Sequence, residues 1–185
     1  MATQLVIGLV GMPASGKTVV ADYLAKRFSA HRIHLGNFIW EFLAKRGVKP
    51  STEMGLMASL YMWAEYGDVP ITNWAYKQLQ KVRNKKLVVL DSLRTMEEAQ
   101  FFQDKLRERF HLIAVLASPS TRLKREQARG RFGKVTKVEF RMRDKEELRL
   151  GVGDLIASSN HYIEANSTIP AIKKHVDKIL KQIRS

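Results

Sequence analysis

The sequence of 185 residues contains no cysteine and no long apolar run. The lack of cysteine excludes a disulfide framework, a thiolate zinc site and a cysteine nucleophile. No segment approaches the roughly 20 apolar residues that a membrane-spanning helix needs, and the first residues lack a basic leader with a small-residue cleavage site. We therefore expect a cytoplasmic protein of one domain without a membrane partner.

Acidic residues are scarce relative to basic ones, with 18 Asp and Glu against 32 Lys and Arg, for a net charge of +14. Such a surplus attracts anions, which include nucleotides, RNA, acidic proteins and membrane surfaces. Residues 122–149 alone carry 11 basic and 5 acidic residues. We expect a concentrated basic face there, and charge alone does not choose among the anionic partners.

Short apolar segments alternate with amphipathic ones along the chain. This order predicts an α/β fold with a mainly parallel sheet, in which ligands bind beyond the carboxyl ends of the strands. The predicted strands are 5–10, 32–35, 87–91, 111–117 and 161–164. The first predicted helix begins near residue 17. Further helices are predicted at 37–46, at 51–82 with a break at 67–70, at 95–109 and at 170–184, and another helical turn starts at Ser118-Pro119.

The segment Gly11-Met12-Pro13-Ala14-Ser15-Gly16-Lys17-Thr18 matches the phosphate-binding loop pattern. Its glycines let the backbone curl so that N–H groups point inward, and the helix that follows adds its positive N-terminal end. In this pattern Lys17 bridges the β and γ phosphates of a nucleotide and the Thr18 hydroxyl binds Mg²⁺. We therefore expect residues 11–18, hereafter the P-loop, to bind ATP, with Gly11, Pro13, Ala14, Ser15 and Gly16 forming the cradle.

Asp91 ends the buried segment VVLD, so it lies at the edge of the sheet where the P-loop is expected. A carboxylate there serves as a second Mg²⁺-organising group or faces the phosphoryl acceptor. The alternative is a helix N-cap, because Asp91 and Ser92 precede a helical segment. Arg94 is either a phosphate contact or an exposed arginine at the start of that helix.

Arg122, Arg125 and Arg129 recur every three or four residues and share one helical face. Arginines on a mobile segment stabilise the charge of a transferring phosphoryl group, which predicts a lid. We assign Arg125 and Arg129 to catalysis and Arg122 to nucleotide binding, with Gly130 and Gly133 as hinges. The alternative is a solvated basic helix face.

Two further groups of residues are interpreted as structural. The five histidines lack metal-ligand spacing. The aromatic residues of the segment 51–82 are typical of packing residues. These are Tyr61, Trp63, Tyr66, Trp74 and Tyr76.

The chain resembles the P-loop kinases of the nucleoside monophosphate kinase type, and most closely an archaeal family of kinase-like proteins related to dephospho-CoA kinase and adenylate kinase. The resemblance covers nearly the whole chain and is carried by GMPASGKT, LGNFIWE, VVLDSLRTMEEAQFF, ASPSTRLKREQARGR, FRMRDKEELRLGVGDLI and HYIEAN. It implies a three-layer P-loop NTPase fold with a five-stranded parallel sheet, with ATP and Mg²⁺ as ligands. It also implies that Asn166 lies near the adenine.

The same resemblance implies a division of the chain into a core, an insertion and a lid. The core comprises 1–36, 83–121 and 150–185. A helical insertion on the acceptor side covers about 37–82, and a basic lid covers about 122–149.

Several positions depart from the pattern of that family. Asn37 and Trp40 stand where Asp and Arg are frequent, Tyr61 stands near another frequent Arg, and Ser92 replaces a glycine. Phe132-Gly133-Lys134 also replaces a polar, acidic stretch of the lid. Because guanidinium groups bind phosphate bidentately, these changes remove the usual grip on an acceptor monophosphate.

The sequence thus predicts an ATP- and Mg²⁺-dependent phosphotransferase acting on a small acceptor such as a nucleotide or a nucleotide-like molecule. Two alternatives stay open, namely an NTPase and a nucleotide-gated RNA- or ribosome-binding protein. The net charge and the altered acceptor positions favour them. Neither the acceptor nor the oligomeric state follows from the sequence.

Overall fold

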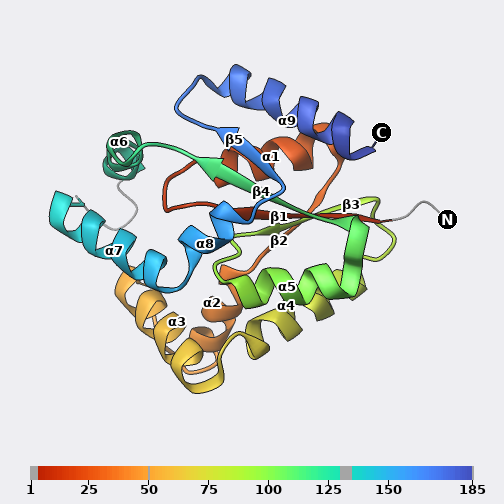
Figure 1. Ribbon diagram of the computed structural model, residues 1–185. Coiled ribbons are helices and arrows are strands. Elements are labelled where there is room, and N and C mark those ends of the chain that lie inside the picture. The colour runs from red at the N-terminus through yellow and green to blue at the C-terminus, as the bar shows by residue number, and fades with distance from the viewer. Residues whose placement is uncertain (1–3, 50, 130–134, 185) are drawn as a thin grey trace.

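A computed structural model describes residues 4–49, 51–129 and 135–184 (Figure 1). Five parallel strands form one sheet in the order β2-β3-β1-β4-β5. This confirms the predicted α/β class and the five-stranded parallel sheet. The strands are β1 (Leu5–Val10), β2 (His31–His34), β3 (Leu87–Asp91), β4 (Phe110–Leu116) and β5 (His161–Glu164).

The sheet is covered on both faces, which is why its central strands are almost wholly apolar. On one face α1 (Lys17–Phe28) and α9 (Ile169–Arg184) pack against β1, β3 and β4, and on the other α5 (Met96–Leu106) and α8 (Val152–Ala157) do so (Figure 1). Phe102 of α5 and Leu24 of α1 are fully buried on these opposite faces. The three layers expected from the sequence are therefore present.

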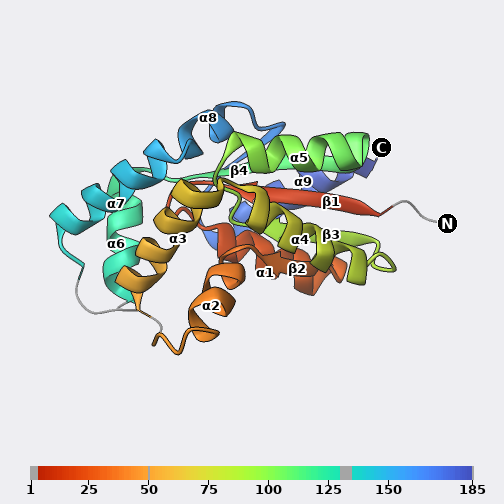
Figure 2. The ribbon, with the colours of Figure 1, turned by 90° about the horizontal axis from the view of Figure 1, so that it is seen from below.

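The remaining helices are α2 (Gly36–Ala44), α3 (Thr52–Tyr66), α4 (Val69–Lys81), α6 (Pro119–Arg129) and α7 (Lys137–Arg149), with a 3₁₀ turn at Arg107–Arg109. Helix α4 joins the core on the α5 face through Ala75 and Leu79, and the others extend beyond the three layers. Helices α3, α6 and α7 gather at the end of the molecule opposite both chain termini (Figure 2). The P-loop lies at this end, because β1 runs toward it.

The segment between β2 and β3 follows the predicted helical pattern, including the break between α3 and α4. Gly67 supplies a positive φ of 58° at the C-terminus of α3, and Pro70 stands in the first turn of α4, where its missing N–H costs nothing. Trp74 and Tyr76 pack against the core as expected. The prediction that the other aromatic residues are packing residues was wrong in part, since Tyr61, Trp63 and Tyr66 are about half exposed.

Trp40, which stands where a phosphate-binding arginine was expected, packs against α3. A Cβ atom on Gly55 would lie 2.5 Å from the edge of the Trp40 indole, so the absent side chain makes room for the ring. The indole therefore belongs to the small core of the α2–α3 unit, together with Ile39, Leu43 and Met62. No helix among the described residues is long and apolar enough to cross a membrane.

Candidate nucleotide site

The P-loop joins β1 to α1 through a backbone that only glycine fits at two points. Gly11 has φ 151°, and a Cβ there would lie 2.4 Å from the carbonyl oxygen of Val115. Gly16 has φ 116° and is the N-cap of α1, so no side chain occupies the helix N-terminus. The N–H groups of the first turn therefore remain free to receive an anion, and the helix dipole favours one there.

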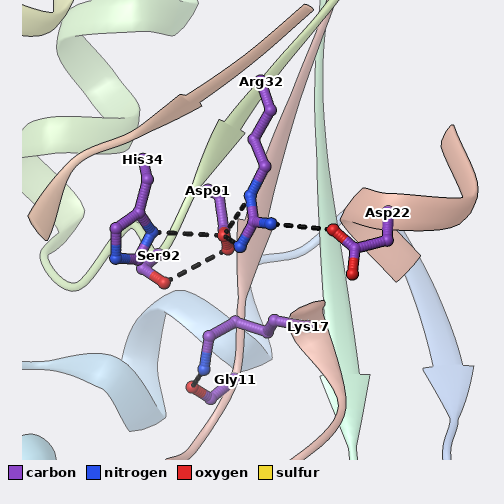
Figure 3. Close-up of polar contacts among 7 residues, drawn as sticks. All are labelled: Gly11, Lys17, Asp22, Arg32, His34, Asp91 and Ser92. Atoms are coloured by element: carbon purple, nitrogen blue, oxygen red, sulfur yellow. Dashed lines mark hydrogen bonds and ion pairs between the residues drawn. The ribbon is translucent and has the colours of Figure 1, made fainter. Parts of the chain in front are cut away.

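The Lys17 side chain folds back over the P-loop. Its ammonium donates to the carbonyl oxygens of Gly11 at 2.6 Å and of Met12 at 3.2 Å (Figure 3). Burial lowers the pKa of Lys17 to about 8, against smaller opposing effects of the Glu147 and Asp91 carboxylates. The ammonium thus lies where phosphate oxygens would replace backbone carbonyls as its partners.

Ser15 contributes a buried hydroxyl without a partner. The residue is 1% exposed, and its Oγ is the one buried side-chain polar atom in the described part of the chain that forms no hydrogen bond. An unsatisfied buried polar group costs about 1–3 kcal/mol, which the protein tolerates at functional sites. The P-loop therefore offers an unused hydrogen-bonding group together with free N–H groups.

Asp91 lies at the carboxyl end of β3, opposite His34 in the β2–β3 register. Its Oδ2 accepts hydrogen bonds from the Arg32 guanidinium, with Nε at 2.9 Å, and lies 3.2 Å from Nδ1 of His34 (Figure 3). Burial alone would raise the pKa of Asp91, but the His34 hydrogen bond and the Arg32 charge outweigh it and lower the pKa to about 2. The carboxylate is therefore ionised at neutral pH.

The alternative reading of Asp91 as a helix cap is wrong. The N-cap of α5 is Thr95, whose hydroxyl accepts the N–H of Glu98 at 3.1 Å. Ser92 follows Asp91 with a φ of 74°, a left-handed conformation that favours glycine. The departure at position 92 thus leaves strain next to Asp91, and the Ser92 hydroxyl lies 3.2 Å from Asp91 Oδ1.

Three residues of this network were missed by sequence reasoning. Arg32 and His34 occupy alternate positions of β2, so both side chains lie on the same face, and Arg32 also donates to Asp22 of α1 at 2.9 Å. His34 was interpreted as structural with the other histidines. The available signal was the alternation of basic and apolar residues in Arg32-Ile33-His34 at a strand end.

The first two lid arginines lie beside the P-loop. Arg125 donates to the carbonyl oxygens of Ser15 at 2.9 Å and of Ala165. Arg122 is 3% exposed and binds Asp144 of α7 through two hydrogen bonds of 2.7 and 2.6 Å. These guanidinium groups therefore brace the loop and join α6 to α7 in this structure.

Arg129 of the predicted lid and Arg94, a predicted phosphate contact or exposed helix-start residue, are placed differently. Arg129 is the most peripheral, with a side chain 44% exposed and 3.7 Å from Glu126. Arg94 lies 3.5 Å from the buried Glu147 of α7, so α7 reaches the start of α5. The proposed hinges Gly130 and Gly133, and the lid segment Arg131 to Lys134, fall outside the described residues.

A cavity of about 380 Å³ lies beside the P-loop, at the carboxyl ends of β4 and β5. The Asn166 side-chain oxygen accepts the N–H of Ser118 at 2.8 Å across its rim. Asn166 thus lines the same cavity as Met12 of the P-loop. The cavity is lined by Met12, Val115, Leu116, Ala117, Ser118, Ile156, Glu164 and Asn166.

Glu98 is a buried carboxyl whose pKa is raised to about 7, chiefly by burial. Because the folded-state pKa exceeds the unfolded value, wild-type stability falls as pH rises from about 4.5 through 7. We expect Glu98→Gln to remove this loss, gaining up to about 3 kcal/mol at pH 8 relative to pH 4.5. Glutamine keeps an oxygen to accept the Arg94 N–H, which lies 2.7 Å from the Glu98 carboxylate.

Urea unfolding of the variant and wild type at several pH values measures this difference. Glu97→Gln is the matched control, since Glu97 is exposed on the same helical turn. Equal pH dependence of wild type and Glu98→Gln would contradict the expected ionisation.

Comparison with known proteins places this chain in a family. An AAA domain family matches residues 7–149. A UPF0200 protein of Methanosarcina barkeri is 34% identical over 179 residues, covering 95% of this chain and 94% of the relative. The chain belongs to the UPF0200 family. A second UPF0200 protein, from Pyrococcus horikoshii, is 32% identical over 185 residues and covers 98% of both chains.

Solved structures share the fold of this UPF0200 protein. TT1252 from Thermus thermophilus matches with a TM-score of 0.68 and 15% identity, covering 97% of this chain and 98% of the other. Shikimate kinase from Acinetobacter baumannii, solved with shikimate, matches with a TM-score of 0.61 and 18% identity, covering 98% and 94%. These similarities establish a P-loop kinase-like fold, and the archaeal relatives confirm the family that the sequence resembled.

Proposed function

We propose that this UPF0200 protein is an ATP- and Mg²⁺-dependent phosphotransferase acting on a small acceptor. The proposal rests mainly on the P-loop. The free N–H groups at the N-terminus of α1 and the Lys17 ammonium both lie in this loop, and a cavity of about 380 Å³ lies beside it. Two similar solved folds belong to shikimate kinases, which supports phosphoryl transfer over other P-loop chemistry.

In the proposed complex the P-loop binds the β and γ phosphates. Lys17 exchanges the carbonyl oxygens of Gly11 and Met12 for phosphate oxygens, and the Ser15 hydroxyl gains a partner. The base enters the cavity between Met12 and Ile156, where the Asn166 amide can donate to it. Arg122 and Arg125 support the loop from behind, and Arg125 and Arg129 supply positive charge if α6 closes further.

The residues of the site fit a magnesium ion held mainly by the nucleotide. The exposed Thr18 hydroxyl is the protein ligand that the P-loop supplies, and the described residues hold no group of three His, Asp or Glu side chains placed to share a metal. Mg²⁺ ordinarily keeps several waters beside one or two protein ligands and substrate phosphates. Bound there, the ion would neutralise charge on the phosphates, while the ionised Asp91 orients a metal-bound water or the acceptor.

The acceptor would lie between α2–α3 and α7, the parts of the chain we assign to the insertion at 37–82 and the lid at 122–149. Arg94 and Arg143 lie close enough to Lys17 to lower its pKa through their charge, and they pair with Glu147 and Glu126 in this structure. They are candidates to bind an anionic acceptor in place of the missing arginines at positions 37 to 61. The proposed division into core, insertion and lid rests on this arrangement.

Hydrolysis of the nucleotide without an acceptor is the second candidate function. It is favoured by the packing of Trp40 against α3, which fills a position where the related kinases hold a phosphate-binding arginine.

The lowered pKa of Lys17 predicts a pH dependence of ATP binding. Phosphates bind the protonated ammonium, so affinity falls about twofold between pH 7 and 8 and toward tenfold per unit as pH rises further above about 8. Isothermal titration in two buffers of different ionisation enthalpy should also record proton uptake on binding near pH 9. Unchanged affinity from pH 7.5 to 9.5 would contradict the role assigned to Lys17.

The proposed reaction is tested by ADP release from MgATP, alone and with nucleoside monophosphates, dephospho-CoA and shikimate as acceptors. A phosphotransferase gives a rate that one acceptor raises severalfold and saturably. A rate that no acceptor changes supports the NTPase instead, and no ADP release under any condition would overturn both functions.

A further inference from the structure

Part of the positive charge of residues 122–149 is paired in the fold. Arg122 forms a bidentate ion pair with Asp144, and Arg129 and Arg143 both pair with Glu126. The segment keeps a net charge of +6, from 11 basic and 5 acidic residues, so the rest of the chain carries the other +8 of the net charge of +14.

A second basic surface lies on α9 and the end of α1, which pack side by side (Figure 1). With about 100° per residue, the cations of α9 fall within an arc of about 140°, opposite its buried apolar side. That buried side is formed by Ile172, Val176, Ile179 and Leu180. We define the α1/α9 face as the exposed basic residues Lys26, Arg27, Lys173, Lys174, Lys178, Lys181 and Arg184.

The cations of the α1/α9 face lack carboxylate partners. Within the described residues, none of these seven side chains forms an ion pair, whereas Arg122, Arg129, Arg143 and Arg149 of the segment 122–149 do. The single acid among them, Asp177, accepts a hydrogen bond from the Tyr23 hydroxyl at 2.9 Å. The positive potential of this face is therefore available to an external anion.

Helix dipoles account for only some of these residues. Cations in the last turns of α1 and α9 complement the negative helix ends, which explains Lys26, Arg27, Lys181 and Arg184. Lys173 and Lys174 lie in the first half of α9, where the dipole disfavours positive charge, and Lys178 lies in its middle. The stability of the helices therefore does not explain why cations continue along the whole length of α9.

The shape of the face favours a polyanion over a membrane. Binding to a bilayer surface uses an amphipathic helix with its apolar side free to insert, whereas the apolar side of α9 is packed into the core. At the far end, a cavity of about 360 Å³ is lined by Arg27, Lys181 and Arg184 together with Phe28, Leu180 and Asp177, and Arg27 and Arg184 both lie over the Phe28 ring. The three cations outnumber the one carboxylate, and guanidinium groups beside an aromatic ring suit a nucleotide unit.

We propose that the α1/α9 face binds the phosphate backbone of a nucleic acid. The cations of α9 extend from residue 173 to residue 184, about 16 Å along the helix, which spans several phosphates of one strand. Lys26 lies nine residues beyond Lys17 on α1, about 13 Å along the axis, so this surface is separate from the P-loop. The proposal does not depend on the proposed phosphotransferase activity.

The test is fluorescence anisotropy of a labelled 20-nucleotide single-stranded RNA, measured from 50 to 200 mM salt with the full chain. The variant K174Q/K178Q/K181Q removes three charges from the face, and K45Q/K137Q/K145Q removes three exposed charges from the C-cap of α2 and from α7 as the matched control. Lys17→Ala separates binding at this face from binding at the P-loop. Circular dichroism of each variant confirms that the fold is retained.

We expect wild-type affinity to fall steeply with salt. The α9 variant should bind roughly tenfold to 100-fold more weakly at 100 mM salt, with a salt slope shallower by about 2, since each single-strand phosphate contact releases about 0.7 counterion. The control and Lys17→Ala should bind as wild type. A single-stranded DNA of the same sequence should bind similarly, because backbone contacts do not read the sugar.

Four outcomes would overturn the proposal. They are no binding at 50 mM salt, equal binding by the α9 variant, an equal loss in the control variant, and binding to vesicles of anionic lipid but to no oligonucleotide. Equal binding by the α9 variant, or an equal loss in the control variant, would indicate that the nucleic acid binds at the lid or the P-loop instead.

Discussion

Replacement of Lys17 by alanine is expected to abolish productive ATP binding. The Lys17 ammonium donates hydrogen bonds to the carbonyl oxygens of Gly11 and Met12 within the P-loop. Residues 11–18 contain no other lysine. Losing a charge-assisted contact to the phosphates in a partly dehydrated site should lower kcat/KM for ATP on the order of 100-fold or more. Titration calorimetry and ADP release measure the two losses.

The fold should survive this substitution. Burial disfavours the charged form of Lys17 and lowers its pKa. Removing the ammonium therefore removes the free-energy cost of keeping a buried charge in the native state. We expect the melting temperature of Lys17→Ala to equal or exceed that of wild type. Lys26→Ala, an exposed position on the same helix, is the control and should leave ATP turnover unchanged. Full turnover by Lys17→Ala would show that the P-loop does not bind the nucleotide as described.

Replacement of Asp91 by asparagine is expected to lower turnover more than ATP affinity. The carboxylate is ionised at the carboxyl end of β3, facing the site, and loss of a group that orients a metal-bound water or an acceptor typically costs 10- to 100-fold. Affinity for ATP should change by less than about threefold. Stability should fall by about 1–3 kcal/mol, because Arg32 and His34 lose their buried anionic partner.

The comparison with Arg32→Met separates two roles of Asp91. Methionine also breaks the ion pair and so costs similar stability, but it leaves the carboxylate in the site. If Asp91 acts on the reacting groups, Arg32→Met keeps most of the turnover that Asp91→Asn loses. If Asp91 serves only to join β2 to β3, both variants lose turnover alike, and the functional role of Asp91 is wrong.

Local patterns predicted the fold because they act over few residues. The apolar run from Leu5 to Val10, followed by a glycine loop and an amphipathic helix, determines the β1–P-loop–α1 unit without reference to the rest of the chain. The helices α7 and α8 were missed, and the six residues of α8 are fewer than two turns and show no periodicity. The strands and the helices α2 to α5 and α9 begin and end within a few residues of expectation.

The polar network at the site could not be predicted, because it depends on strand order. Arg32 and His34 meet Asp91 only when β2 pairs with β3 in the observed register, and these residues lie 57 to 59 positions apart in the sequence. The pairing of Arg122 with Asp144 likewise depends on how α7 returns to α6. Composition therefore indicated that residues 122–149 are basic but not which of their arginines are paired.

The fate of the γ-phosphoryl group of ATP tests the proposed phosphotransferase activity most directly. The protein is incubated with Mg²⁺ and ATP labelled at the γ position, with each acceptor in turn, and the labelled products are separated. A phosphotransferase transfers the label to one small acceptor in proportion to the ADP formed, and Lys17→Ala is expected to transfer no label. Label that appears only as inorganic phosphate with every acceptor, or no release of label at all, would contradict a phosphotransferase.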